Sequence, residues 1–253
     1  MRFPQPRRLP DALALVPSGR SLLVGFALLL AAGGAYLGAR QSSLFAIDTI
    51  EVQGASPPLA ARVRASLAPL EGTSLLALSG AEVERRVSAL PETLSVRHDR
   101  AFPHTLRVVV RPERPVAVLR KDAQAWLVSA RGRVIETLPP DVLPGLPRIW
   151  LPQAVDISLG ETLSTDDGGR AVAAVAPVVG RGFPDRVRLV RASASELTLV
   201  LRSGLELRLG DGSDLRLKLA IARRILTTII APGYVDVSVP ERPVTGQEPQ
   251  VAG

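Results

Sequence analysis

Few residue types in this sequence could do chemistry. His98 and His104 are its only imidazoles, and cysteine is absent from all 253 residues. Without cysteine there is no disulfide, thiol nucleophile or Cys-ligated zinc, and two histidines with no third ligand beside them do not make a zinc site. No G-x-S-x-G, P-loop, G-x-G-x-x-G or H-E-x-x-H motif is present. The sequence therefore predicts no metal, no cofactor, no small-molecule substrate and no enzymatic activity.

Two pairs of aspartates are the remaining candidates for acid–base work or ion binding. Asp166 and Asp167 form one pair, and Asp211 and Asp214 form the other. Each pair lies at a glycine-containing turn before a predicted helix, where aspartate is favoured as a cap or turn residue. We therefore interpret both pairs as structural.

The formal charge of +7 does not indicate a nucleic-acid-binding protein. Part of the basic excess lies in residues 1–20, and the rest is spread along the chain without interleaved aromatic residues. A nucleic-acid-binding domain gathers its basic residues on one face or places them among stacking aromatics. The distribution of charge therefore predicts a function other than nucleic-acid binding.

Residues 21–39 are predicted to form a membrane-spanning helix. They carry no charge between Arg20 and Arg40, and a helix of this length spans about 28 Å, close to the roughly 30 Å bilayer core. Four arginines and one aspartate occupy residues 1–20, whereas only Arg40 follows the helix before Arg62. The positive-inside rule predicts a type II single-pass protein with a cytoplasmic tail at 1–20 and an extracytoplasmic C-terminal part.

Two alternatives for this segment stay open. A cleaved signal peptide would have its apolar region at 22–32 and its processing site at 33–35, but the apolar run continues beyond that site. Gly34 and Gly38 form a G-x-x-x-G pair that would let another helix pack closely, although glycine is also common in membrane helices without this role. We expect a retained anchor, with Gly34 and Gly38 as candidate packing residues.

Residues 44–120 predict a small α+β domain directly behind the anchor. A strand ending at Gly54, two helices, and a hairpin turning at 102–104 give the order β-α-α-β-β. A capping box at Ser79–Glu82 begins the second helix, and Pro91 stops it.

The order and spacing of these motifs resemble a POTRA domain of the FtsQ type. The matching stretches are Phe45–Gly54, Gly72–Leu76, Leu90-Pro91, Phe102–Leu106 and Arg111–Ala117. Each stretch is short, but together, behind a single N-terminal anchor, they form a specific pattern. The resemblance continues to about Thr245.

Residues 121–239 predict a mixed, mostly antiparallel β-rich domain. The clearest elements are a hairpin at 197–209, an amphipathic helix at about 213–230, and a last strand at 234–239. Prolines recur after this strand, so that residues 240–253 are expected to form a disordered tail.

The last strand is the candidate partner-binding site. One face carries Tyr234, Asp236 and Ser238, and the other carries Val235, Val237 and Val239. The strand has no lysine, arginine or interior proline, the residues that usually protect a sheet edge. An unprotected edge accepts a partner strand by β-augmentation. The alternative is that another strand of the same chain, or the tail, already covers it.

The second domain resembles the C-terminal domain of the FtsQ/DivIB division proteins, most closely at 234–237. The resemblance implies a non-enzymatic scaffold of the bacterial division machinery in the plasma membrane, concentrated at the septum and linked to septal cell-wall synthesis proteins. It also implies two bitopic partners: a strand of FtsB adds to the C-terminal edge, and FtsL joins FtsB through a coiled coil.

Basic residues on the preceding helix extend this hypothesis. Arg223 and Arg224, with Arg216 and Lys218, would either pair with acidic groups of a partner or form a solvated helix face. The alternative function is that of a POTRA-containing accessory protein in secretion or outer-membrane assembly, but only one POTRA-like unit is found. An anchored hydrolase would need convergent polar residues in a pocket.

Overall fold

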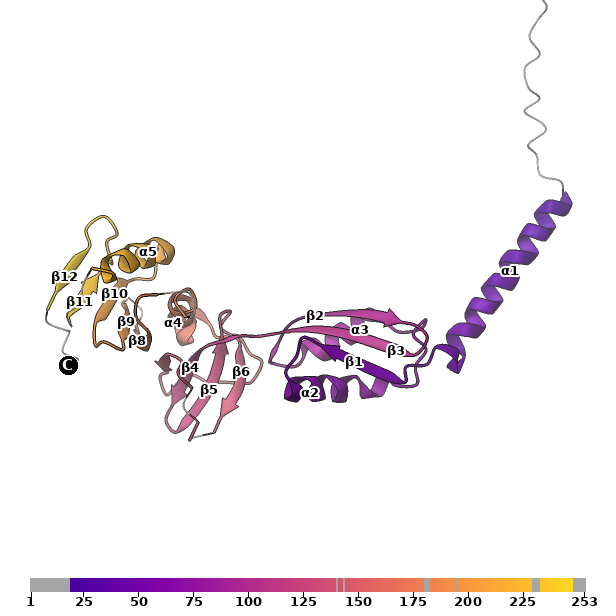
Figure 1. The fold of residues 1–253 in the computed structure, drawn as a ribbon, viewed down its shortest axis with the longest axis horizontal. Coiled ribbons are helices and arrows are strands. Elements are labelled where there is room, and N and C mark those ends of the chain that lie inside the picture. The colour runs from indigo at the N-terminus through magenta and orange to yellow at the C-terminus, as the bar shows by residue number, and fades with distance from the viewer. Residues whose placement is uncertain are drawn as a thin grey trace, which may run out of the picture.

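The structure is a computed structural model that describes residues 19–139, 141–142, 144–179, 183–193, 195–228 and 233–247. An N-terminal helix, a small α+β domain and a β-rich domain follow one another in chain order (Figure 1).

Helix α1 (Gly19–Gln41) contains the predicted membrane span. None of its residues is buried, and it is the one helix in the described part of the chain that is long and apolar enough to cross a bilayer. The cytoplasmic tail predicted at 1–20 lies almost entirely outside the described residues.

The first domain has the predicted β-α-α-β-β order, which is confirmed. It consists of η2 (Ser43–Phe45), β1 (Thr49–Gln53), α2 (Pro57–Leu67), η3 (Ala68–Leu70), α3 (Gly80–Ser88), β2 (Thr93–Ala101) and β3 (Thr105–Pro112). In the sheet, β3 lies between β1, to which it is parallel, and β2, to which it is antiparallel. The apolar stripes of α2 and α3 pack on the inward residues of β3. Ser79 does precede α3, but its side chain makes no capping hydrogen bond.

The second domain is one sheet of nine strands in the order β12-β11-β10-β9-β8-β7-β4-β5-β6. The strands are β4 (Pro115–Lys121), β5 (Gln124–Ser129), β6 (Val134–Leu138), β7 (Arg148–Trp150), β8 (Val187–Ala192), β9 (Leu197–Leu201), β10 (Glu206–Gly210), β11 (Tyr234–Asp236) and β12 (Val244–Gly246). We expected the domain boundary near residue 120. Because β4 belongs to this sheet, the boundary lies at residues 113–114.

The helices of this domain pack on one face of the sheet. They are η4 (Thr165–Gly169), α4 (Arg170–Val175) and α5 (Leu215–Leu226). Val172 of α4 and Leu219 of α5 belong to one apolar core with Leu199 and Leu207 of the central strands. The helical face therefore holds the sheet together, and the opposite face carries polar residues such as Arg191.

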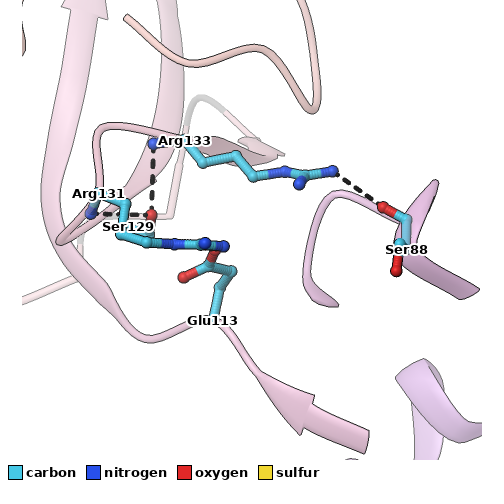
Figure 2. Close-up of polar contacts among 5 residues, drawn as sticks. All are labelled: Ser88, Glu113, Ser129, Arg131 and Arg133. Atoms are coloured by element: carbon cyan, nitrogen blue, oxygen red, sulfur yellow. Dashed lines mark hydrogen bonds and ion pairs between the residues drawn. The ribbon is translucent and has the colours of Figure 1, made fainter. Parts of the chain in front are cut away.

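A short joint connects the two domains (Figure 2). Only Glu113 and Arg114 separate β3 from β4. The buried carboxylate of Glu113 pairs with the guanidinium of Arg131, whose Nε lies 3.1 Å from Oε1. The Ser129 hydroxyl accepts the backbone N–H groups of Arg131 and Arg133, each at 3.3 Å.

The same turn also reaches the first domain. The guanidinium of Arg133 donates to the carbonyl oxygen of Ser88, the last residue of α3, at 3.2 Å. We call these five residues (Ser88, Glu113, Ser129, Arg131 and Arg133) the joint. A two-residue linker between prolines, tied by side chains of both domains, has little freedom to bend.

Candidate functional site

The candidate site is the end of the nine-stranded sheet formed by β10, β11 and β12. Val235 and Val237 are fully buried and hold β11 against the core. Glu206 N–H donates to the carbonyl of Gly233, and Val237 N–H donates to the carbonyl of Arg208, both at 2.9 Å. Strand β11 is therefore a fixed, parallel neighbour of β10.

The prediction that residues 234–239 form a sheet edge is wrong. Strand β11 spans only Tyr234–Asp236, and β12 pairs with its other side in antiparallel register. Ser238 and Val239 lie beyond the strand in a turn, where Ser238 N–H donates to Asp236 Oδ1 at 2.8 Å. The chain thus covers its own strand, which was the alternative left open from the sequence.

The expectation of a disordered tail from residue 240 onward is also wrong up to residue 247. Pro240 lies in the turn after β11, and Pro243 comes directly before β12. Neither proline interrupts the ladder, because the three residues that pair with β11 contain none. Residues 248–253 lie outside the described residues.

The free edge is the outer side of β12, which we call the β12 edge. In the described part of the chain no strand pairs with it. Main-chain groups alternate in direction along a strand. Since Gly233 and Val237 point toward β10, Tyr234 and Asp236 point toward β12, where Gly246 and Val244 lie opposite them. Thr245, between these two, therefore directs its N–H and C=O outward.

The β12 edge is short. The residues whose main-chain groups point outward are Pro243, Thr245 and Gln247, and proline has no N–H to donate. A short edge beside a proline is a device that limits non-specific strand pairing. A partner strand that binds here must gain specificity from side chains on the neighbouring strands.

Tyr234 supports β12 from beneath. A Cβ on residue 246 would collide with the ring of Tyr234, so that a larger residue there would have to displace this ring. The guanidinium of Arg208 lies 4.0 Å from the centre of the same ring. Tyr234 is therefore held between β10 and β12, and its ring contacts a residue of each strand.

A charged row crosses the sheet face next to Tyr234. The carboxylate of Glu206 is almost fully buried and lies 2.8 Å from Arg191 and 3.9 Å from Arg208. The side chain of Arg191 is 45% exposed. Asp236 stands opposite Arg208 in the register, so the two guanidinium groups of this face are balanced by two carboxylates.

The basic residues of helix α5 differ in their exposure to solvent. Arg223 and Arg224 are exposed near its C-terminal end. Lys218 is fully buried and lies 3.0 Å from Asp211 Oδ1 and 3.4 Å from Ser213 Oγ, so its assignment to an exposed basic face is wrong. Hydrogen bonds from Ser213 and then Lys218 hold the pKa of Asp211 well below its ordinary value.

The other predicted residues lie away from this site. Gly34 and Gly38 are exposed on α1, where an added side chain would meet no other atom within 4 Å. His104 Nδ1 lies 3.1 Å from the carbonyl of Ala46, and the ring of His98 packs on Gly80. Within the described ranges, no group of three or more His, Asp or Glu residues is placed to hold a metal ion.

The residues that form the edge and the charged row are not indicated by the sequence patterns described above. These are Arg191, Glu206, Arg208, Val244, Thr245 and Gly246. The available signal was the β-branched pair Val244-Thr245 following a proline, which is a common start for a short edge strand.

Comparisons with known proteins agree with this architecture. Residues 45–111 match the family model described as "POTRA domain, FtsQ-type", and residues 117–238 match the one described as "Cell division protein FtsQ/DivIB, C-terminal". The chain is also 27% identical over 237 residues to a protein named cell division protein FtsQ from Streptomyces venezuelae. That alignment covers 91% of this chain and 85% of the relative.

Proposed function

Because the chain belongs to the FtsQ/DivIB family of cell division proteins, we propose that it is a non-enzymatic scaffold that recruits FtsB-type and FtsL-type partners by strand addition at the β12 edge. The single observation that carries this mechanism is the outward-facing main chain of Thr245 at the end of the sheet. Family membership favours division over the role in secretion or outer-membrane assembly considered from the sequence.

Strand addition provides both affinity and register. A partner strand would bond to the N–H and C=O of Thr245 and lie beside Val244, which is 53% exposed. Its side chains would then contact the neighbouring side chains on β12, which set the register of the added strand. Tyr234 and Asp236 act by holding β12 in place.

The exposed arginines of α5 have a separate place in this mechanism. Arg223 and Arg224 lie on the helical side of the sheet, across from Arg191. They meet acidic residues of a helical partner segment, such as the coiled coil of FtsB and FtsL, that passes beside the domain end. Val235 and Val237 contribute only through the core.

The anchor determines where these encounters occur. Helix α1 confines the protein to the plasma membrane, with the N-terminus in the cytoplasm and the β12 edge outside it, at the division septum. Both partners are bitopic, so that confinement to one membrane raises their effective concentration. Gly34 and Gly38 provide a close-packing surface for the membrane helix of a partner, including membrane-embedded septal synthesis proteins.

The test compares two substitutions at one position in the full chain. Thr245→Pro removes the outward N–H but none of the bonds to β11, whereas Thr245→Ala keeps the N–H and removes only the side chain. We expect the Pro variant to bind a purified FtsB–FtsL-type pair about tenfold or more weakly in calorimetric titration, because an unmade backbone hydrogen bond costs about 1–3 kcal/mol.

Thr245→Ala is the matched control and is expected to bind like the parent chain. Equal affinity of the Pro variant and the parent would contradict strand addition at the β12 edge. Equal loss in both variants would assign the binding to the threonine side chain.

A further inference from the structure

Two large apolar side chains are exposed at the end of the POTRA domain that follows the anchor. Leu44 in η2 is 67% exposed, and Phe102 in the β2–β3 turn is 52% exposed. Figure 1 shows this turn beside the C-terminal end of α1. Leu44 and Phe102, together with Phe45, are called the tip.

The tip is one rigid unit formed from two separate chain segments. The rings of Phe45 and Phe102 are 5.5 Å apart in an edge-to-face arrangement. The carbonyl of His104 accepts the N–H groups of Asp48 at 3.0 Å and of Thr49 at 3.2 Å. The turn therefore cannot move independently of the segment that leaves the membrane.

The chain length places the tip at the bilayer surface. Helix α1 ends at Gln41, and only three residues separate Gln41 from Phe45. Four residue steps reach at most about 14 Å, even in a fully extended chain. Arg40, the first charge after the apolar run, lies at the boundary of the hydrocarbon core, and the headgroup layer beyond that boundary is roughly 5–8 Å thick.

Exposed leucine and phenylalanine side chains are stabilised at such a boundary. Each Å² of apolar surface that leaves water lowers the free energy by about 25 cal/mol. Phenylalanine and leucine are also typical of segments that lie in the membrane interface. Phe102 is held outward by its contact with Phe45. The tip thus presents a preformed apolar surface to whatever lies next to the end of α1.

We propose that the tip inserts into the extracytoplasmic headgroup region of the lipid bilayer and seats the POTRA domain on the membrane. This attachment of the POTRA domain to the membrane, which we call the seat, has two points. One is the covalent connection at Gln41, and the other is the apolar contact of Leu44 and Phe102 with lipid. Two points restrict the tilt of the domain, and the joint transmits this orientation to the second domain. The seat depends on α1 spanning the membrane and is independent of strand addition at the β12 edge.

The absence of cysteine makes a direct test possible, because a single introduced cysteine takes a spin label at one site. Leu44→Cys, Phe102→Cys and Val109→Cys are each prepared in the full chain, labelled, and reconstituted in phospholipid vesicles without any partner. Collision of the label with oxygen, which concentrates in the bilayer, is compared with collision with a water-soluble nickel chelate.

Val109 is the matched control. It is an exposed apolar residue, 39% accessible, on the same hairpin, and it lies about 13 Å further along β3 than Thr105 at 3.3 Å per residue. We expect the oxygen-to-nickel ratio at positions 44 and 102 to be several-fold higher than at position 109. An equal ratio at all three positions would overturn the proposal.

A second variant separates insertion from mere proximity. Phe102→Glu, combined with the label at position 44, places a charge in the tip, and we expect it to lower the oxygen-to-nickel ratio at that label toward the value at position 109. An unchanged ratio would show that Phe102 is not part of the seat. Because these vesicles contain only this protein and lipid, the result is independent of the partner titration.

Discussion

The two ends of the nine-stranded sheet are treated in opposite ways by the chain. At the β6 end, Val134 N–H donates to the carbonyl of Glu161, and Gly160 N–H donates to the carbonyl of Val134, both at 2.8 Å. The beginning of β6 is thus covered by the chain's own loop. At the β12 end, no described strand occupies the outer side of Thr245.

The two ends differ in their distance from the POTRA domain. The β6 end is also next to the POTRA domain, because Arg133 reaches Ser88 and a Cβ at Gly160 would lie 3.5 Å from Pro91. One end of the sheet therefore joins the POTRA domain, and the opposite end has no further strand in the described residues. A single sheet serves as the spacer between them.

The largest difference in stability is expected between two single proline variants, one at each end of the sheet. Val134→Pro removes the N–H that bonds to Glu161 and leaves the carbonyl of Glu161 without this donor, and we expect it to lower the free energy of unfolding by about 3 kcal/mol. Thr245→Pro removes an N–H with no partner in the described chain and is expected to change stability by less than about 0.5 kcal/mol. Chemical denaturation of both variants measures this difference. Similar losses at the two positions would contradict the contrast between a closed and an open end.

The next effect concerns the support of the open end. Tyr234→Ala removes the ring that lies under Gly246 and against Arg208. We expect a loss of about 1–3 kcal/mol in stability from the buried area and the cation–π contact, together with weaker partner binding. Tyr234→Phe keeps the ring and is the control. Normal binding by the Ala variant would show that β12 does not depend on Tyr234.

A smaller effect is expected at the joint. Glu113→Gln replaces the buried carboxylate that pairs with Arg131, and a hydrogen bond to a charged group contributes about 1.5–3 kcal/mol. Because the side chain of Arg131 is 53% exposed and stays hydrated, we expect a loss near the lower value. Spin labels on the two domains should show a broader distance distribution. An unchanged distribution would mean that the prolines alone fix the joint.

The smallest effect concerns acid stability near the open end. The pKa of Asp211 is held below its ordinary value of 3.8 by Ser213 and Lys218. Protons therefore bind more readily in the unfolded chain, and the stability from this group is present above about pH 4 and lost as the pH falls further. We expect Asp211→Asn to flatten the dependence of unfolding free energy on pH in this range. An unchanged slope would contradict the assigned interaction.

Local pattern predicted most of the elements. The apolar run at 21–39, the order of the first domain, and the buried faces of Val235 and Val237 all follow from periodicity that the structure retains. In each case the element is determined by interactions between residues close in the chain, or by burial of one face of the helix or strand in the core.

The errors concern pairings that periodicity does not specify. Whether β11 is an edge depends on which strand lies next to it, and Pro243 in the sequence argues against a strand at 244–246. Lys218 has the spacing of an inward-facing residue, four positions before Ala222, and only its charge argues for exposure. Asp211 and Ser213 provide the partners that let its ammonium group be buried. The position of Thr245 as the open residue follows only from the alternation of backbone bonds across three strands.

Hydrogen exchange of single amides in β12 tests the open edge most directly. In the full chain without a partner, the amide of Thr245 should exchange rapidly, while those of Val244 and Gly246, which face β11, should be protected. Adding the FtsB–FtsL-type pair should slow exchange at Thr245 and leave its two neighbours nearly unchanged. If Thr245 exchanges at the same rate in the bound and free states, the β12 edge is not where the partner docks.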